Sequence, residues 1–212
     1  FKIVNSFLSA EDKNFFEHPG VDAKGVLRAT KNNISNIFLS KRLEGASTIT
    51  QQVAKNFLLS NELSISRKVK EALLAIKIDA TLSKSRILEL YLNQIYLGSG
   101  TYGVAAASNR YFNKSLEELD LSEVSFLAAL PKAPSRYNPK KNYEKSLSRR
   151  NWVLKRMYLN NYINKNDYDV YAMNPIKIRA SNNKPVYSSD YYLEEIRKQI
   201  IKIYDEDILY GG

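Results

Sequence analysis

Glu11 is a carboxylate placed on an apolar stripe of the sequence. Its neighbours on that stripe are Val4, Phe7, Leu8 and Phe15, and this spacing puts all five side chains on one face of a helix. Burying an ionised carboxylate costs free energy, so we expect the pKa of Glu11 to be raised. A carboxylate with a raised pKa can transfer protons near neutral pH. The stripe alone equally fits an acid at a helix end that faces solvent.

Glu71 has the opposite surroundings. Arg67 and Lys68 precede it by four and three residues, so on a helix both cations can lie on the same side as the carboxylate. Such a carboxylate stays ionised. Two acids in contrasting environments are typical of an acid/base pair. For Glu71 taken alone, an ion pair within a helix is the simpler interpretation.

A further polar group follows a helix start at Thr48. Residues 48–51 fit a T-x-x-Q capping box, and Thr48, Gln52 and Lys55 then share one polar face. A helix N-terminus offers free backbone N–H groups, and Lys55 adds a full charge, so this face could cradle a phosphate. A capped amphipathic helix with one lysine is common, so this interpretation depends on other residues.

Two more side chains could contribute. Asn93, on a helical turn, could face the core as a hydrogen-bonding anchor. Lys132 lies between Pro131 and Pro134, so it is a cation on a rigid loop that could address an anion. Structural roles explain both residues equally well.

The elements that position these residues are predicted to be helices, and the fold class is mainly α. Asp22, Ser64 and Ser83 can cap helices, and a stretch at 175–187 looks extended or irregular. The predicted helices cover about 2–16, 22–33, 48–59, 64–82, 83–97, 103–112, 122–130, 143–162 and 189–204.

Two segments carry particular expectations. Residues 72–76, at the centre of the helix 64–82, are apolar all round, which predicts a buried central helix. Residues 31–44 mix lysines with apolar side chains, and three alternatives stay open for them. They could form a mobile loop, an amphipathic piece that lies on a membrane, or an ordinary solvated connection.

Composition narrows the possible functions. The net charge of +10 favours an anionic partner such as a phosphorylated substrate or an anionic membrane surface. The scattered tyrosines form no stacking array for bases, so nucleic acid is a poor explanation for the charge. With no cysteine and one histidine, disulfides are excluded and a structural zinc site is not expected.

The sequence also indicates how the protein could be exported and anchored. It has no run of 18 apolar residues and no signal peptide, and it begins at Phe1. We therefore expect an export signal or membrane anchor upstream of this chain. The terminal residues 210–212 resemble the start of a linker, so a further domain is expected downstream.

Five motifs, in order along the chain, resemble those of the peptidoglycan glycosyltransferase family (family 51), the module of class A penicillin-binding proteins and monofunctional transglycosylases. The resemblance covers roughly residues 4–140, with a weaker helical continuation. The matching segments are Glu11–Gly20 (E-D-x-x-F-x-x-H-x-G), Gly45–Lys55 (G-G-S-T-x-T-Q-Q-x-x-K), Arg67–Ala72 (R-K-x-x-E-A), Ile87–Asn93 and Ala128–Ser135.

The resemblance implies a lysozyme-like, two-lobed helical domain over 1–212. A larger globular lobe would face a small membrane-associated lobe, within about 20–45, across a cleft. The family works on the outer face of the bacterial cytoplasmic membrane, where a segment outside this chain would anchor it. The downstream domain would then be a transpeptidase.

The implied reaction is the processive polymerisation of lipid II into β-1,4-linked glycan, with release of undecaprenyl pyrophosphate. Glu11 would be the general base on the acceptor 4-hydroxyl, and Glu71 would assist at the donor pyrophosphate. The substrate-binding residues implied by the motifs are Asp12, Phe15, His18, Ser47, Thr48, Gln52, Lys55, Arg67, Lys68, Asn93 and Lys132.

The resemblance also implies partners. They are lipid II, the growing glycan chain and the anionic membrane surface, and moenomycin-type inhibitors are expected to bind the donor site. No protein metal site is expected, but a divalent cation (Mg²⁺ or Mn²⁺) could act at the pyrophosphate. No nucleic acid partner is expected.

Three departures from the family pattern stand out. Ala46 replaces a common glycine, a change that we expect to be harmless, and Leu63 replaces a common arginine that faces the pyrophosphate. The 59 residues between Glu11 and Glu71 are a few more than usual, which suggests an insertion within 31–44.

Two alternatives are compatible with parts of the sequence. A lysozyme-like lytic enzyme acting on peptidoglycan would share a catalytic glutamate, but it has no need for the cations at 55, 67 and 68. A non-catalytic basic domain that binds membranes or nucleic acid would tolerate the substitution Glu11→Gln.

Overall fold

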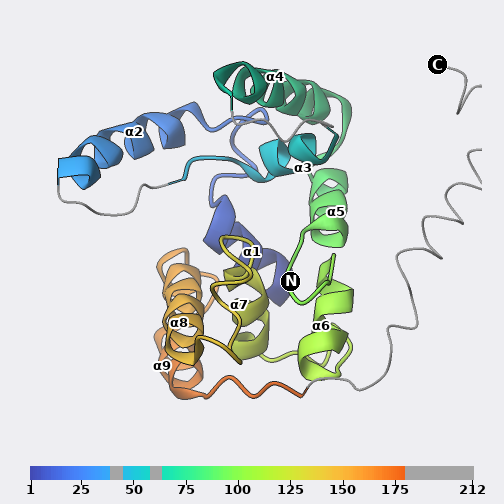
Figure 1. Cartoon of the computed structure of the whole chain (residues 1–212), viewed down its shortest axis with the longest axis vertical. Coiled ribbons are helices and arrows are strands. Elements are labelled where there is room, and N and C mark those ends of the chain that lie inside the picture. Colours follow the sequence, from blue (N-terminus) through green and yellow to red (C-terminus); the bar gives the residue numbers. More distant parts are fainter. Residues whose placement is uncertain (39–44, 58–63, 180–212) are drawn as a thin grey trace, which may run out of the picture.

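The computed structural model describes residues 1–38, 45–57 and 64–179, and within these ranges the chain is helical apart from turns and one isolated β-bridge, Tyr96 to Tyr102 (Figure 1). The predicted mainly α class is confirmed. The helices in these ranges are α1 (Lys2–Glu11), α2 (Ala23–Phe38), α3 (Ile49–Phe57), α4 (Ile65–Thr81), α5 (Lys84–Gln94), α6 (Val104–Phe112), α7 (Leu121–Ala129), α8 (Tyr143–Leu159) and α9 (Lys165–Met173).

The helices form two groups that face each other. In the view of Figure 1, α2, α3 and α4 lie above, α1, α7, α8 and α9 lie below, and α5 and α6 run along one side. In the lower group α7 packs against α1 and against α8, which spans Tyr143–Leu159, and in the upper group α3 packs against α4. The chain passes between the groups at the end of α1, so this end lies where the groups meet.

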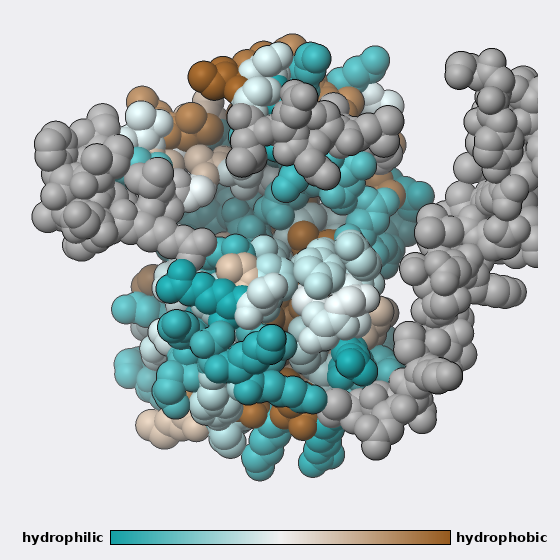
Figure 2. Space-filling model, in the orientation of Figure 1, coloured by the Kyte–Doolittle hydropathy of each residue, from teal (hydrophilic) through white to brown (hydrophobic). Residues whose placement is uncertain are grey.

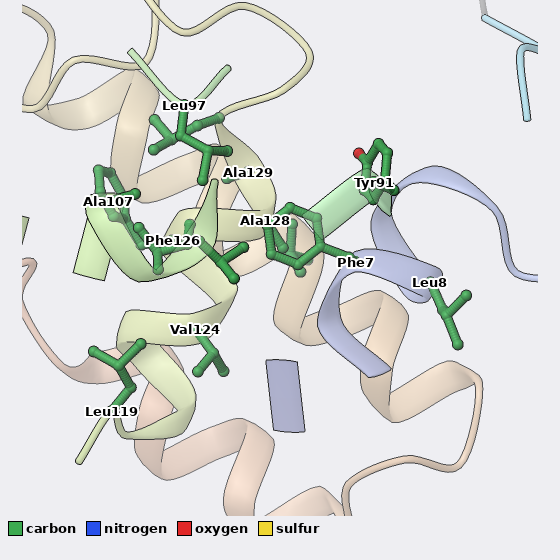
Figure 3. Close-up of a cluster of buried hydrophobic side chains, with 14 of the residues drawn as sticks. Phe7, Leu8, Tyr91, Leu97, Ala107, Leu119, Val124, Phe126, Ala128 and Ala129 are labelled. Atoms are coloured by element: carbon green, nitrogen blue, oxygen red, sulfur yellow. The ribbon is translucent and has the colours of Figure 1, made fainter. Parts of the chain in front are cut away.

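The hydrophobic core is centred on α7 and extends through α5 and α6 to Ile49 and Val53 of α3. Figure 3 shows Phe7 of α1 between Tyr91 of α5 and Ala128 of α7, and the rings of Phe7 and Tyr91 meet edge to face at 6.0 Å. All residues of α7 except Glu123 are buried. Helix α7 is therefore a central helix of the fold.

The prediction that α4 is a buried central helix is wrong. Ile65, Val69, Leu73 and Ile76 lie at helical spacing along one side of α4 and are exposed, Leu73 by 63%. Only Glu71 and Ala75 of this helix are buried. An apolar sequence predicts an apolar environment, and it does not say whether that environment is the protein interior or something outside it.

The predicted helix starts are confirmed by their capping hydrogen bonds. The side chains of Asp22, Ser64 and Ser83 accept the backbone N–H of the residue three positions later, at 2.8, 3.1 and 3.3 Å. Thr48 and Gln51 form the predicted reciprocal capping box, with hydrogen bonds of 3.1 and 3.0 Å. These starts depend on local contacts, which a sequence pattern captures.

Several helix ends differ from the prediction. The first helix ends at Glu11 rather than near residue 16, because the backbone of Asp12 leaves the helical conformation, with φ −156° and ψ 77°. The predicted helix 143–162 ends at Leu159 and is followed by the separate helix α9. Helix α2 continues to Phe38, so of the three alternatives for 31–44 the loop does not apply to residues 31–38, whereas an amphipathic helical piece agrees with the structure there.

Some predictions fall outside the described residues. These are the conformation of 39–44, the end of α3 beyond residue 57, the helix at 189–204 and the surroundings of Leu63. Within the described ranges, no helix is both long enough and apolar enough to cross a membrane.

Candidate active site

A cleft of about 1020 Å³ opens between the two groups of helices. The end of α1 and one side each of α2, α3, α4 and α8 contribute to its walls. The structure brings ten of the predicted site residues together here: Glu11, Asp12, Ser47, Thr48, Gln52, Lys55, Arg67, Lys68, Glu71 and Lys132.

Glu11 is the last residue of α1 and faces the cleft. Its carboxylate accepts a 3.0 Å hydrogen bond from the side-chain amide of Gln52 on α3. Burial raises the pKa of Glu11, while the Gln52 hydrogen bond and the positive charges of Arg149 and Lys132 act in the opposite direction. The expected perturbed acid is therefore present, and it lies in a cleft rather than in bulk solvent.

Glu71 lies across the cleft on α4 and is only 3% exposed. Lys68 forms an ion pair with its carboxylate, and Arg67 approaches the other carboxylate oxygen at 4.0 Å. The Lys68 ammonium also donates a 2.9 Å hydrogen bond to the hydroxyl of Ser47, just before α3. The predicted ion pair within the helix is confirmed, and it joins α4 to the segment that leads into α3.

Asp12 lines the cleft, but its hydrogen bonds join parts of the fold. Its carboxylate accepts the N–H of Ile49, the first residue of α3, at 3.0 Å. Both carboxylate oxygens also lie 3.0 Å from Nε2 of His18. Asp12 therefore fixes the start of α3 against the end of α1, which places Gln52 beside Glu11.

Three predicted site residues lie outside the cleft lining. Phe15 and His18 are buried beneath it, where their rings meet edge to face at 6.2 Å. Asn93 is exposed near the end of α5, so it does not face the core as expected. The structure gives these residues packing or surface positions, and none of them reaches the cleft.

The backbone conformation and surroundings of Gly20 explain why the motif Glu11–Gly20 ends in glycine. Its φ is +85°, and a Cβ at this position would lie 2.5 Å from the carbonyl oxygen of Ala75 on α4. The Thr48 hydroxyl donates a 2.6 Å hydrogen bond to the carbonyl of Gly20. Since this hydroxyl also caps α3, the Gly20 turn holds α3 and α4 together at the cleft.

Sequence reasoning missed the wall of the cleft that α8 provides. Arg149, Trp152 and Arg156 line it at the spacing i, i+3, i+7. The Arg149 guanidinium lies 3.9 Å from the centre of the Trp152 ring, and that of Arg156 lies 5.8 Å away. Two arginines at helical spacing around the only tryptophan of the chain were the available signal. Arg28 and Asn32 of α2 also line the cleft and were not predicted.

The described residues do not form a metal site of their own. No three histidine, aspartate or glutamate side chains gather anywhere in the described ranges in a way that could hold an ion. Among the residues that the structure describes, Glu71 supplies the carboxylate on the wall that carries Arg67 and Lys68, and both of its oxygens face these cations.

Comparison with known proteins gives consistent matches. Residues 2–158 match the family model described as Transglycosylase. Penicillin-binding protein 1A of Rickettsia typhi is 48% identical over 212 residues, which cover 99% of this chain and 27% of that protein. The protein of the same name from Aquifex aeolicus is 47% identical over 99% of this chain and 28% of its own length.

The chain thus spans about a quarter of the length of these curated relatives. Among solved structures, a crystal structure of penicillin-binding protein 1A from Haemophilus influenzae is 38% identical. It aligns with 75% of this chain and 20% of its own, with a TM-score of 0.45.

Proposed function

The chain belongs to the transglycosylase family, and we propose that it is a peptidoglycan glycosyltransferase that polymerises lipid II into β-1,4-linked glycan. One observation carries the proposal. A carboxylate with a raised pKa, Glu11, shares a cleft with a second carboxylate, Glu71, that is held by two cations. This arrangement supplies a base on one side and positive charge on the other.

The base step uses Glu11. Its carboxylate takes the proton of the acceptor 4-hydroxyl as that oxygen attacks the anomeric carbon of the donor. The new carbon–oxygen bond forms as the bond to the pyrophosphate oxygen breaks, so the configuration at carbon inverts in one displacement. Gln52 holds the ionised carboxylate through its 3.0 Å hydrogen bond and so keeps the base oriented.

We assign the binding of the pyrophosphate leaving group to the cations across the cleft from Glu11. Lys55, Arg67 and Lys68 line the cleft there and can stabilise the negative charge that develops on the pyrophosphate. Because pyrophosphate leaves readily, these cations can replace the general acid that a glycosidase needs. Glu71 holds Arg67 and Lys68 in place and acts through them.

The remaining polar residues divide into two roles. The Ser47 hydroxyl accepts from Lys68 and lies in the cleft, where it can also contact the donor. The Thr48 hydroxyl serves the α3 cap and Gly20, so its contribution to donor binding is the placement of α3. Lys132 faces the cleft near Glu11 and is assigned to the substrate anion. Moenomycin-type inhibitors would bind the donor side of this cleft.

The exposed apolar surface supports a location at the membrane. The apolar side of α4 and the exposed Val26 and Leu27 of α2 lie in the upper group, and Figure 2 shows hydrophobic residues gathered along that edge. With a net charge of +10, this edge suits the anionic outer face of the bacterial cytoplasmic membrane. The membrane-facing lobe proposed from the sequence, within about 20–45, would then include α4 as well.

Purified protein incubated with lipid II tests the proposal. Synthesis predicts a glycan polymer and released undecaprenyl pyrophosphate, whereas a lytic enzyme would instead cleave finished peptidoglycan. The variant Glu11→Gln should lose polymerisation by about 10²- to 10⁴-fold, because it removes the base but keeps the side-chain shape. Polymerisation at the normal rate by this variant would show that the mechanism is wrong. The same assay with and without a chelator tests for a divalent ion at the pyrophosphate.

A further inference from the structure

The wall of the cleft that α8 forms has no role in the proposed glycosyl transfer. Its side chains Arg149, Trp152 and Arg156 form one row, which we call the α8 row. At 1.5 Å of rise per residue, the row is about 10 Å long. The near end, Arg149, acts electrostatically on Glu11, so the row leads away from the base along the cleft.

The α8 row presents two guanidinium groups to the cleft, an arrangement suited to binding an anion. Arg149 is only 8% exposed, and its guanidinium lies 3.9 Å from the centre of the Trp152 ring, a contact that restricts its position. The Nε of Arg156 is buried and has no hydrogen-bond partner within the described part of the chain. A fixed guanidinium fork matches the two oxygens of a carboxylate better than a lysine would. The row therefore favours a planar anion lying along the cleft.

The position of the row decides which anion it meets. Arg67 and Lys68 lie on α4, the helix that also carries the exposed apolar side chains. A pyrophosphate joined to a lipid must stay close to the lipid, so it belongs at α4. The α8 row also lines the cleft, but its helix belongs to the lower group of helices (Figure 1), whereas α4 belongs to the upper group. An anion bound there belongs to a part of the substrate that points away from the membrane.

We propose that the α8 row binds a carboxylate of the peptide carried by the muramic acid sugar of the substrate. This inference rests on the proposed function and extends it. In a lipid-linked peptidoglycan precursor, the anionic groups besides the pyrophosphate are the peptide carboxylates. Such a contact holds the sugar beside Glu11 through its peptide and selects substrates whose peptide carboxylates are free.

The first test measures KM and kcat for lipid II and for lipid II with amidated peptide carboxylates. With the wild type, amidation should raise KM about fivefold to tenfold, because a charge-assisted hydrogen bond is lost. Arg156→Gln should raise KM for lipid II by a similar factor and leave KM for the amidated form unchanged. Lys155→Gln removes an exposed cation from the same helix and should change neither value.

A second test needs no turnover, so it separates this proposal from the proposed function. Trp152 is the only tryptophan in the chain, and its fluorescence should respond to a soluble muramyl pentapeptide. The amidated peptide should give no response, and Arg156→Gln should weaken the response about fivefold to tenfold. A response to peptide without polymerisation would support the α8 row and reject the glycosyltransferase.

Three results would overturn the proposal. The first is a wild-type KM that is the same for lipid II and for its amidated form. The second is an Arg156→Gln variant that loses affinity equally for both forms of lipid II, and the third is a Trp152 signal that responds to inorganic pyrophosphate but not to the muramyl peptide. The amidation result with the wild type does not depend on the folding of any variant.

Discussion

The Gln52 amide donates a 3.0 Å hydrogen bond to the Glu11 carboxylate and joins the start of α3 to the end of α1. These residues are 41 positions apart in the chain. The bond stabilises the ionised carboxylate and so lowers its pKa, whereas burial raises it. The pH at which Glu11 works therefore depends on how the start of α3 is held at the end of α1.

Replacing Gln52 by alanine should move the pH dependence of polymerisation. Without the hydrogen bond the pKa of Glu11 rises further, so the acid limb of the kcat/KM profile should shift to higher pH. The profile with lipid II measures this shift. Asn56→Ala, which removes an exposed amide one turn later on the same helix, should leave the limb in place. If the acid limb of the profile stays at the same pH in both variants, the catalytic base is a group other than Glu11.

Replacing Glu11 by glutamine should change stability in a pH-dependent way. Because the folded pKa of Glu11 is raised, the folded state holds the proton more tightly than the unfolded state does. This contribution favours folding at low pH and is lost as pH rises through the folded pKa. Glu11→Gln should therefore be at least as stable as the wild type at neutral pH, by thermal melting, although it is inactive. A variant that melts lower at pH 7 would contradict this sign.

Replacing Asp12 by alanine should destabilise the fold. The change leaves the buried N–H of Ile49 and the His18 ring without their acceptor, which costs about 1–3 kcal/mol. Urea unfolding measures the loss. Asp169→Ala removes an exposed ion pair with Lys165 on α9 and should cost clearly less stability than Asp12→Ala, because exposed ion pairs contribute little. Equal losses in the free energy of unfolding for the two variants would show that Asp12 does not hold the start of α3 in place.

Replacing Gly20 by alanine should also destabilise the fold, through a different cause. The φ of +85° disfavours alanine, and its Cβ would meet the Ala75 carbonyl, so we expect a loss of about 2 kcal/mol or more. Gly100→Ala is the matched control, since its φ is +73° but a Cβ there meets no atom within 4 Å. That variant should lose only about 1 kcal/mol. Similar unfolding midpoints would show that the contact with α4 is unimportant.

Replacing Leu73 by glutamine should weaken binding to anionic lipid vesicles without lowering stability. Leu73 is exposed on α4, so the change removes apolar area that only an outside partner can bury. Sedimentation with vesicles measures the binding of the 212-residue chain. Val170→Gln, at an exposed apolar position on α9 in the lower group, should bind as the wild type does. Equal binding of the two variants would place the membrane surface elsewhere.

The sequence by itself determined the local features of this protein. The caps at Asp22, Thr48, Ser64 and Ser83 and the ion pair of Lys68 with Glu71 involve residues within four positions of each other. Such contacts follow from helix geometry, so a pattern of residue types predicts them. The motifs likewise indicated the family, which the comparisons confirm.

Only the tertiary structure decided what depends on distant contacts. It placed the apolar side of α4 at the surface, and it brought the α8 row to the cleft more than 130 residues after Glu11. It also showed that Asp12 holds the start of α3 and that His18 lies beneath the cleft. A sequence pattern reports which face of a helix is apolar or charged. Which neighbour that face meets is settled only when helices from distant parts of the chain pack together.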